Sequence, residues 1–112
     1  MRTIHAPGKP PVYNIDLSGG RTLGLYLDPG KAGFNTVHGT FVDAQGHELI
    51  LARAPQITAG RVGQPPRALP VLREGPGHFS SDAEFEPGEW QLEIAATTRT
   101  GETLHARLAI RL

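Results

Sequence analysis

The side chains of this sequence that could bind a transition metal are its five histidines, because the chain has no cysteine and a single methionine. Imidazole nitrogen suits copper and zinc, whereas Cu(I) favours sulfur ligands. A site on strands needs two histidines on one face, either two residues apart or directly across a hairpin, and no pair meets this requirement locally. Only tertiary structure could assemble a site, and the candidate ligands are His38, His78 and His105. The alternative is solvated histidines at outward strand positions.

Residue types of a hydrolytic triad occur in the segment His78–Asp82, which contains His, Ser and Asp. Because these residues are adjacent on one strand, they cannot converge as a triad does, from separated segments. Asp28, Asp43 and Asp82 could ligate calcium at one end of the fold. Asp28 and Asp43 stand in turns, however, where aspartate side chains bond to nearby backbone amides. We therefore expect no catalytic residues and no enzyme.

The charge balance excludes two classes of partner. The 112 residues contain 11 Lys and Arg against 11 Asp and Glu, a net charge of zero. Nucleic-acid platforms and polybasic membrane binders both need an excess of positive charge. The longest apolar run, Leu49–Ala52, is far shorter than the ~20 residues of a membrane span. We expect no nucleic-acid binding and no membrane insertion by this segment.

The elements that must position these residues are strands. Fourteen glycines and ten prolines interrupt the chain at short intervals, and apolar residues alternate with polar ones between them, as in half-buried strands. In the first predicted hairpin Tyr13, Ile15 and Leu17 precede a Gly-rich turn. We expect Leu17 to face Leu23, which places Tyr13 opposite Leu27 on the same face of the sheet.

A second hairpin is predicted at the C-terminal end, from alternating runs over 90–96 and 104–110. A three-residue loop, Arg99–Gly101, fits a bulged turn with Gly101 at the left-handed position. The register that follows pairs Leu92 with Leu108, Ile94 with Ala106, Glu93 with Arg107, and Glu89 with Arg111. Apolar pairs on one face and opposite charges on the other support this register.

The remaining chain is expected to contain strands over 35–42, 67–73 and 78–85, with an extended segment of unknown register over 49–57 and a loop over 60–66. Seven or eight strands without a helix predict an all-β fold, an immunoglobulin-like antiparallel β-sandwich. Residues 1–11 are expected to form a Pro-rich linker, and residues 12–112 the sandwich domain. Tyr26, which points away from the face of Leu25, is the ring expected to be exposed.

An ordered set of motifs resembles a known family. Five features occur in sequence: Asp28-Pro29, Gly33-Phe34-Asn35, Asp43-Ala44-Gln45-Gly46, Gly75-Pro76-Gly77-His78-Phe79 and Pro87-Gly88-Glu89-Trp90-Gln91-Leu92. They resemble the YtkA-like domain, which is found on exported proteins and at the C-terminal end of CopC/CopD-type copper transport proteins. The match covers about two thirds of the chain and consists mostly of turn glycines and core aromatics.

The resemblance implies an immunoglobulin-like sandwich outside the cytoplasm, in the periplasm or at the cell surface. It implies a partner that is a membrane protein, or a membrane region of the same parent chain, and an association with copper. The first hypothesis is accordingly a non-catalytic accessory domain of a copper transport or resistance protein. The second is a structural or protein-interaction module of a surface protein without metal. The third is a small ligand- or sugar-binding domain at a concave sheet end that exposes Tyr26.

Overall fold

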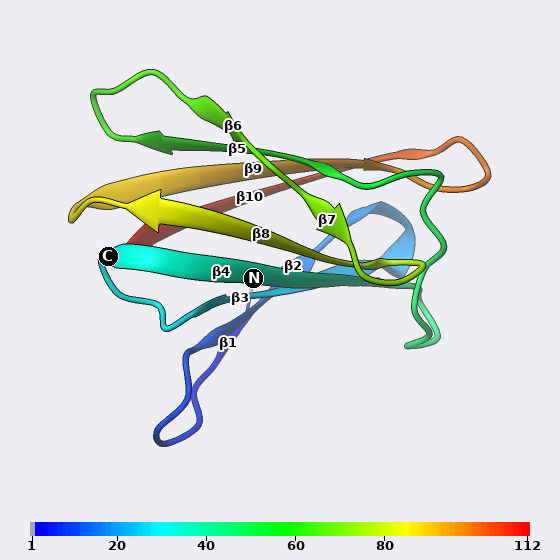
Figure 1. Cartoon of the computed structure of the whole chain (residues 1–112). Helices are drawn as coiled ribbons and strands as arrows, with labels where there is room; N and C mark the ends of the chain where they lie inside the picture. The colour runs from blue at the N-terminus through cyan, green and yellow to red at the C-terminus, as the bar shows by residue number, and fades with distance from the viewer. Residues whose placement is uncertain (1) are drawn as a thin grey trace.

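Ten β-strands make up most of the protein in the computed structural model, which describes residues 2–112 (Figure 1). The strands are β1 (Arg2–Ile4), β2 (Val12–Asp16), β3 (Thr22–Asp28), β4 (Gly33–Val42), β5 (Gln56–Arg61), β6 (Arg67–Leu69), β7 (Leu72–Arg73), β8 (His78–Phe85), β9 (Glu89–Thr97) and β10 (Thr103–Arg111). One short 3-10 helix, Ser18–Gly20, joins β2 to β3. No helix in this part of the chain is long and apolar enough to cross a membrane.

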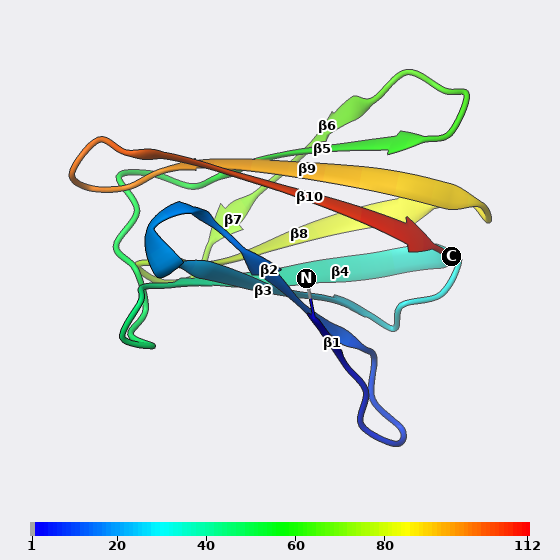
Figure 2. The same cartoon turned by 180° about the vertical axis from the view of Figure 1, so that it is seen from behind.

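The strands form two antiparallel sheets packed face to face (Figures 1 and 2). The larger sheet has the order β1-β2-β3-β4-β8-β7, and the smaller has the order β10-β9-β5-β6. The prediction of an all-β, immunoglobulin-like sandwich is confirmed. The strand number is ten, above the predicted seven or eight, because Arg2–Ile4 pair with Val12–Asn14 and because the run 67–73 is split in two.

The C-terminal hairpin has the predicted register. Leu92 pairs with Leu108 and Glu93 with Arg107 across β9 and β10. Gly101 adopts a φ of 91° in the three-residue loop, and the Thr98 amide donates to the Glu102 carbonyl at 2.8 Å. Local patterning on both faces of two long strands was sufficient to predict this element.

The first hairpin keeps its predicted faces but not its register. Tyr13 pairs with Leu25 and Ile15 with Leu23, a slip of two residues from the expected pairing. The observed loop is tighter than the predicted one: the Leu17 amide donates to the Arg21 carbonyl at 2.8 Å, so the helical turn Ser18–Gly20 forms the whole connection. A slip of two leaves every side chain on its original face, so the apolar pattern could not distinguish the two registers.

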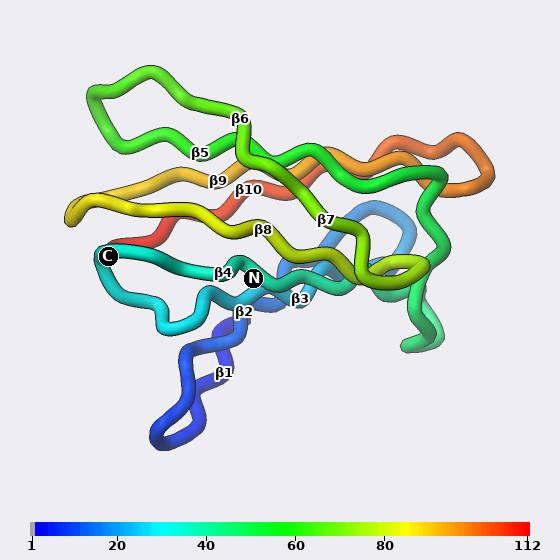
Figure 3. Tube along the Cα trace, in the orientation of Figure 1, coloured from blue at the N-terminus to red at the C-terminus, as the bar shows by residue number. Residues whose placement is uncertain are grey.

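The segment predicted as one strand over 67–73 crosses from one sheet to the other. β6 pairs with β5 in the smaller sheet and β7 pairs with β8 in the larger one, and Figure 3 traces the descent between them. Pro70 lies at the crossing, where it has no amide to donate to a ladder. The buried Ser81 Oγ donates to the Pro70 carbonyl and holds the crossing against β8. Upstream, β5 extends to Arg61, into the predicted loop.

The core lies between the sheets and consists of the alternate residues that the sequence pattern indicated. The largest fully buried side chains include Phe41, Phe79, Phe85, Leu92 and Leu108. Trp90 is buried as well: its ring meets Phe85 edge-on at 5.0 Å, and its indole N–H donates to the Glu86 carbonyl at 2.8 Å. The long strands β3, β4, β8, β9 and β10 therefore bury one face and leave the other free to carry polar side chains.

Candidate functional site

Two of the three candidate histidines meet on the outer face of the larger sheet. His38 lies in β4 and His78 in β8, and these strands are neighbours although 40 residues of sequence separate the two histidines. His38 pairs with Ser80, while His78 pairs with Thr40, so the histidines are diagonal neighbours. Their ring centroids are 6.5 Å apart and the ring planes differ by 18°. Both rings point outward because the residues next to them, Val37 and Phe79, fill the core.

Tyr26 extends this row of rings onto a third strand. It pairs with His38 across β3 and β4, and the two rings stack with centroids 4.7 Å apart and planes 17° apart. The expectation of an exposed Tyr26 is half met: the residue points outward, but its ring is partly covered by the neighbouring imidazole. The three side chains form an outward-facing row, the Tyr26–His38–His78 row, across β3, β4 and β8.

Hydrogen bonds fix one end of the row. Thr40 Oγ1 and His78 Nδ1 lie 2.7 Å apart, which leaves Nε2 as the outward nitrogen of His78. A partner on one ring nitrogen orients an imidazole and sets which nitrogen can bind a metal. Beside the row, Ser80 Oγ donates to Glu74 Oε1 at 2.7 Å. The site thus offers imidazole nitrogens, hydroxyls and one nearby carboxylate.

The third candidate, His105, lies elsewhere. It belongs to β10, pairs with Ala95 of β9, and is exposed on the outer face of the smaller sheet. The core of the sandwich separates this face from the Tyr26–His38–His78 row. His5 and His47 are exposed in loops, and His47 Nδ1 is 3.9 Å from Asp43 Oδ2. The tertiary structure therefore brings together two of the three candidate ligands.

The ligand types of the row, two imidazoles with oxygen groups nearby, are those of an open metal site. Two imidazoles bound to one ion have centroids at most ~6 Å apart even when they lie on opposite sides of it, given metal–nitrogen distances of about 2.0 Å, so the His38 and His78 rings, 6.5 Å apart, must move closer to share an ion. Within residues 2–112 no three His, Cys, Asp or Glu gather closely enough to hold an ion. The protein would thus supply two ligands, and the remaining positions would fall to water or to a partner.

The residues with triad chemistry do not converge. His78 and Ser80 point outward, whereas Ser81 points into the core and donates to Pro70. The Asp82 carboxylate accepts a bond from Thr36 Oγ1 at 2.7 Å. A nucleophile and its base must lie within hydrogen-bond reach of each other, but on the outer face of β8 His78 is paired with Thr40 and Ser80 with Glu74.

Two of the three calcium candidates, Asp43 and Asp82, make structural contacts. Asp43 Oδ1 accepts from the amides of Gln45 and His47, each at 2.9 Å. These amide bonds, that from His47 above all, hold the pKa of the Asp43 carboxyl below its ordinary value of 3.8. Asp28 and Asp82 lie on different strands, β3 and β8, separated by β4. Asp43 therefore serves the turn after β4, as aspartate commonly does.

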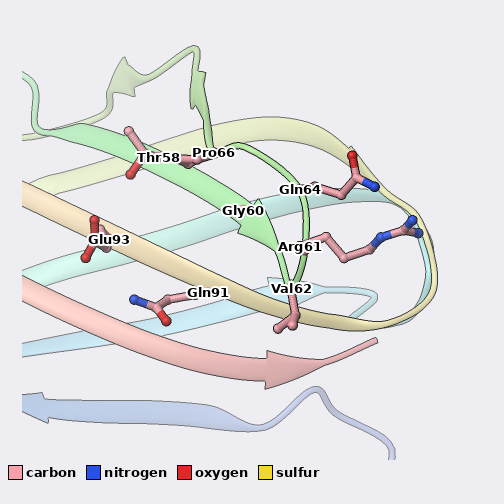
Figure 4. A pocket seen from close by; sticks show the side chains of 9 residues that line it. Thr58, Gly60, Arg61, Val62, Gln64, Pro66, Gln91 and Glu93 are labelled. Carbon is pink, nitrogen blue, oxygen red and sulfur yellow. The ribbon is translucent and has the colours of Figure 1, made fainter.

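A separate shallow pocket of about 260 Å³ lies on the smaller sheet (Figure 4). Thr58 of β5 and Gln91 and Glu93 of β9 form its floor, and Val62 and Gln64 of the β5–β6 loop form its rim. Tyr26, the ring expected in a sugar-binding end, lies on the other sheet. The pocket therefore lacks the aromatic platform of the third hypothesis.

From the sequence, His38 and His78 were grouped with His105 as candidate ligands, and Tyr26 was considered only as a separate exposed ring. The missing information was the order β3-β4-β8, in which the two outer strands are distant in sequence. The contact of Thr40 with His78 was missed for the same reason. Comparisons of the chain with protein-family models, with curated proteins and with solved structures find no match.

Proposed function

We propose that this protein is a non-catalytic, extracytoplasmic accessory domain of a copper transport or resistance system, and that the Tyr26–His38–His78 row is its metal-contact site. The observation that carries the proposal is the meeting of His38 and His78 on one face, with centroids 6.5 Å apart. The motifs that resemble the YtkA-like domain support the extracytoplasmic setting and the link to copper. A membrane protein, or a membrane region of the parent chain, is the proposed partner.

The chemistry of the row suits Cu(II) better than Cu(I). Imidazole and oxygen ligands favour Cu(II), whereas Cu(I) selects sulfur, and the only methionine of the chain is Met1. Two protein ligands make an open site, which binds weakly and can share its ion with a partner's ligands. An accessory domain that passes copper to or from a membrane protein needs this reversibility.

A copper titration of designed variants tests the proposal. The first variant, His38→Ala with His78→Ala, removes the pair. The matched control carries His5→Ala, His47→Ala and His105→Ala, and keeps only the pair. We expect saturable binding of about one Cu(II) by the wild type and the control, and a loss of at least about tenfold in affinity in the first variant, equivalent to about 1.4 kcal/mol. Equal binding by both variants would refute a site at the pair.

The second candidate function is a protein-interaction module that binds no metal. Three exposed apolar side chains on the outer face of the larger sheet favour it: Ile4, Phe34 and Leu72 are 56%, 60% and 64% exposed. Contiguous exposed apolar groups mark interaction surfaces in soluble proteins; these three lie on separate strands, β1, β4 and β7, so each offers a single contact point. Absence of a saturable copper site in the wild-type titration would leave this candidate in place of the first.

A further inference from the structure

The four sheet edges of the sandwich differ in how far they are protected against pairing with another chain. β1, β6 and β7 are edge strands of three, three and two residues. Prolines flank all three: Pro7, Pro10 and Pro11 follow β1, Pro65 and Pro66 precede β6, Pro70 separates β6 from β7, and Pro76 follows β7. Short length and nearby proline are devices by which proteins blunt sheet edges.

The fourth edge, β10, has neither device. It is nine residues long, contains no proline, and pairs with β9 in an unbroken register from Thr103 to Arg111. Its burial alternates strictly, so no bulge twists it away and no charge points inward. Figure 2 shows β10 running the length of the sandwich as the outermost strand of its sheet.

The hydrogen-bond pattern identifies which backbone groups of β10 are free. Gly88 and Leu112 exchange two bonds, each of 2.9 Å, and the Thr98 amide bonds to Glu102 at the other end. Bonded pairs recur at every second residue of an antiparallel ladder, so the even-numbered residues of β10 bond to β9. The amides and carbonyls directed away from β9 belong to Thr103, His105, Arg107, Ala109 and Arg111.

The side chains of these same residues are positively charged or neutral, and none is acidic. Arg107 and Arg111 already bind Glu93 and Glu89, each with a closest N–O distance of 2.8 Å. These pairs are exposed, so each is worth no more than about 1 kcal/mol. An arginine has five N–H donors and can bind a second carboxylate on the side of the free edge.

We propose that the free edge of β10 binds an extended acidic segment of a partner polypeptide by strand addition. Main-chain bonds to the five outward residues supply affinity, and carboxylates opposite Arg107 and Arg111 supply selectivity. A second copy of β10 is a poorer partner. In a symmetric antiparallel pair of two β10 strands, bonds to all five outward residues require Arg107 of one copy to lie opposite Arg107 of the other. Like charges directly opposite each other destabilise a sheet.

Two capped synthetic peptides test this proposal on the full chain. One alternates valine and glutamate, and the other replaces each glutamate by lysine. With the glutamate peptide, we expect amide hydrogen exchange of His105, Arg107 and Ala109 to slow by at least about tenfold, as new ladder bonds require. The lysine peptide should give no protection. In a variant with Arg107→Glu and Arg111→Glu, the preference between the two peptides should reverse.

A proline substitution serves as an independent check. Ala109→Pro removes an outward amide that makes no bond to β9, so the fold is retained while strand addition is lost. Circular dichroism and denaturant unfolding of this variant verify the fold. The proposal is overturned if the outward amides of β10 are already protected in the free protein, or if both peptides bind equally. Concentration-dependent dimerisation that Ala109→Pro abolishes would assign the edge to a second copy instead and would also overturn it.

Discussion

At the scale of single residues, the inner faces of the two sheets leave no room for additional atoms beside Phe79. Gly39 pairs with Phe79 in the β4–β8 ladder, and a Cβ atom on Gly39 would lie 2.5 Å from Cε1 of the Phe79 ring and 3.1 Å from Leu25 Cδ1. The glycine therefore creates the space in which the phenylalanine ring packs. Gly39 directly follows His38, whose side chain points outward, in β4.

We predict that Gly39→Ala destabilises the protein by about 1–3 kcal/mol, because overpacking a well-filled core displaces rings and backbone. Gly24→Ala is the matched control: Gly24 faces outward on the adjacent strand, and its Cβ would meet Asn14 Oδ1 at 3.5 Å, an ordinary contact. Urea unfolding of both variants measures the difference. Similar stabilities of the two variants would contradict this prediction, because they would mean that the Phe79 ring can shift to make room for the added methyl group.

Asp43 provides a pH-dependent prediction. Because its pKa is lowered in the folded state, chiefly by the amide of His47, the ionised carboxylate favours folding. Its contribution is present above the ordinary pKa of 3.8 and is lost as the pH falls through the lower folded value. Asp43→Asn should therefore be less stable than the wild type at neutral pH, and the two should converge in acid. A difference in unfolding free energy that stays constant with pH would contradict this assignment.

At the scale of elements, the two hairpins show which features of a sheet are encoded locally. β9 and β10 carry matching patterns on both faces, and the predicted pairs of Glu93 with Arg107 and Glu89 with Arg111 are present. The first hairpin has a pattern on its apolar face only, so its loop geometry decided the register. The crossing at Pro70 could not be predicted from the periodicity. The extended pattern of the sequence continues through Pro70, although the pairing partner changes there from β5 to β8.

The bond from Ser81 to Pro70 holds this crossing, and its removal is a third prediction. Ser81→Ala should cost about 1 kcal/mol, the usual net value of a buried hydrogen bond. Ser80→Ala is the control on the same strand: it removes an exposed bond to Glu74 and should change stability by no more than about 0.5 kcal/mol. Thermal unfolding of both variants, followed by circular dichroism, measures this. An effect of Ser80→Ala as large as that of Ser81→Ala would contradict the assigned role.

At the scale of the whole molecule, the fold class followed from composition and alternation, whereas the candidate site followed from topology. The order β3-β4-β8 places Tyr26, His38 and His78 side by side. No local pattern specifies that β8 rather than β5 lies beside β4. The same topology places His105 on the other sheet, although its outward position on β10 is equally clear in the sequence.

Metal binding at the row should be detectable in the stability of the whole domain. A ligand that binds only the folded state raises stability by RT ln(1 + [L]/Kd), which is about 2.7 kcal/mol at a hundredfold excess over Kd. We predict that Cu(II) raises the melting temperature of the wild type and of the variant that lacks His5, His47 and His105. In the variant that lacks His38 and His78 the rise should be at most about half as large, because a tenfold loss of affinity leaves about 1.4 kcal/mol at the same concentration of Cu(II). An equal rise in that variant would place the ion elsewhere.

The most direct test of the proposed metal-contact site is a Cu(II) titration followed by NMR of the five histidine rings at substoichiometric metal. Cu(II) is paramagnetic and broadens the signals of the rings that it contacts. We predict that the signals of His38 and His78 broaden first and together, while those of His5, His47 and His105 stay sharp. Uniform broadening of all five rings, or early loss of His105 alone, would contradict it.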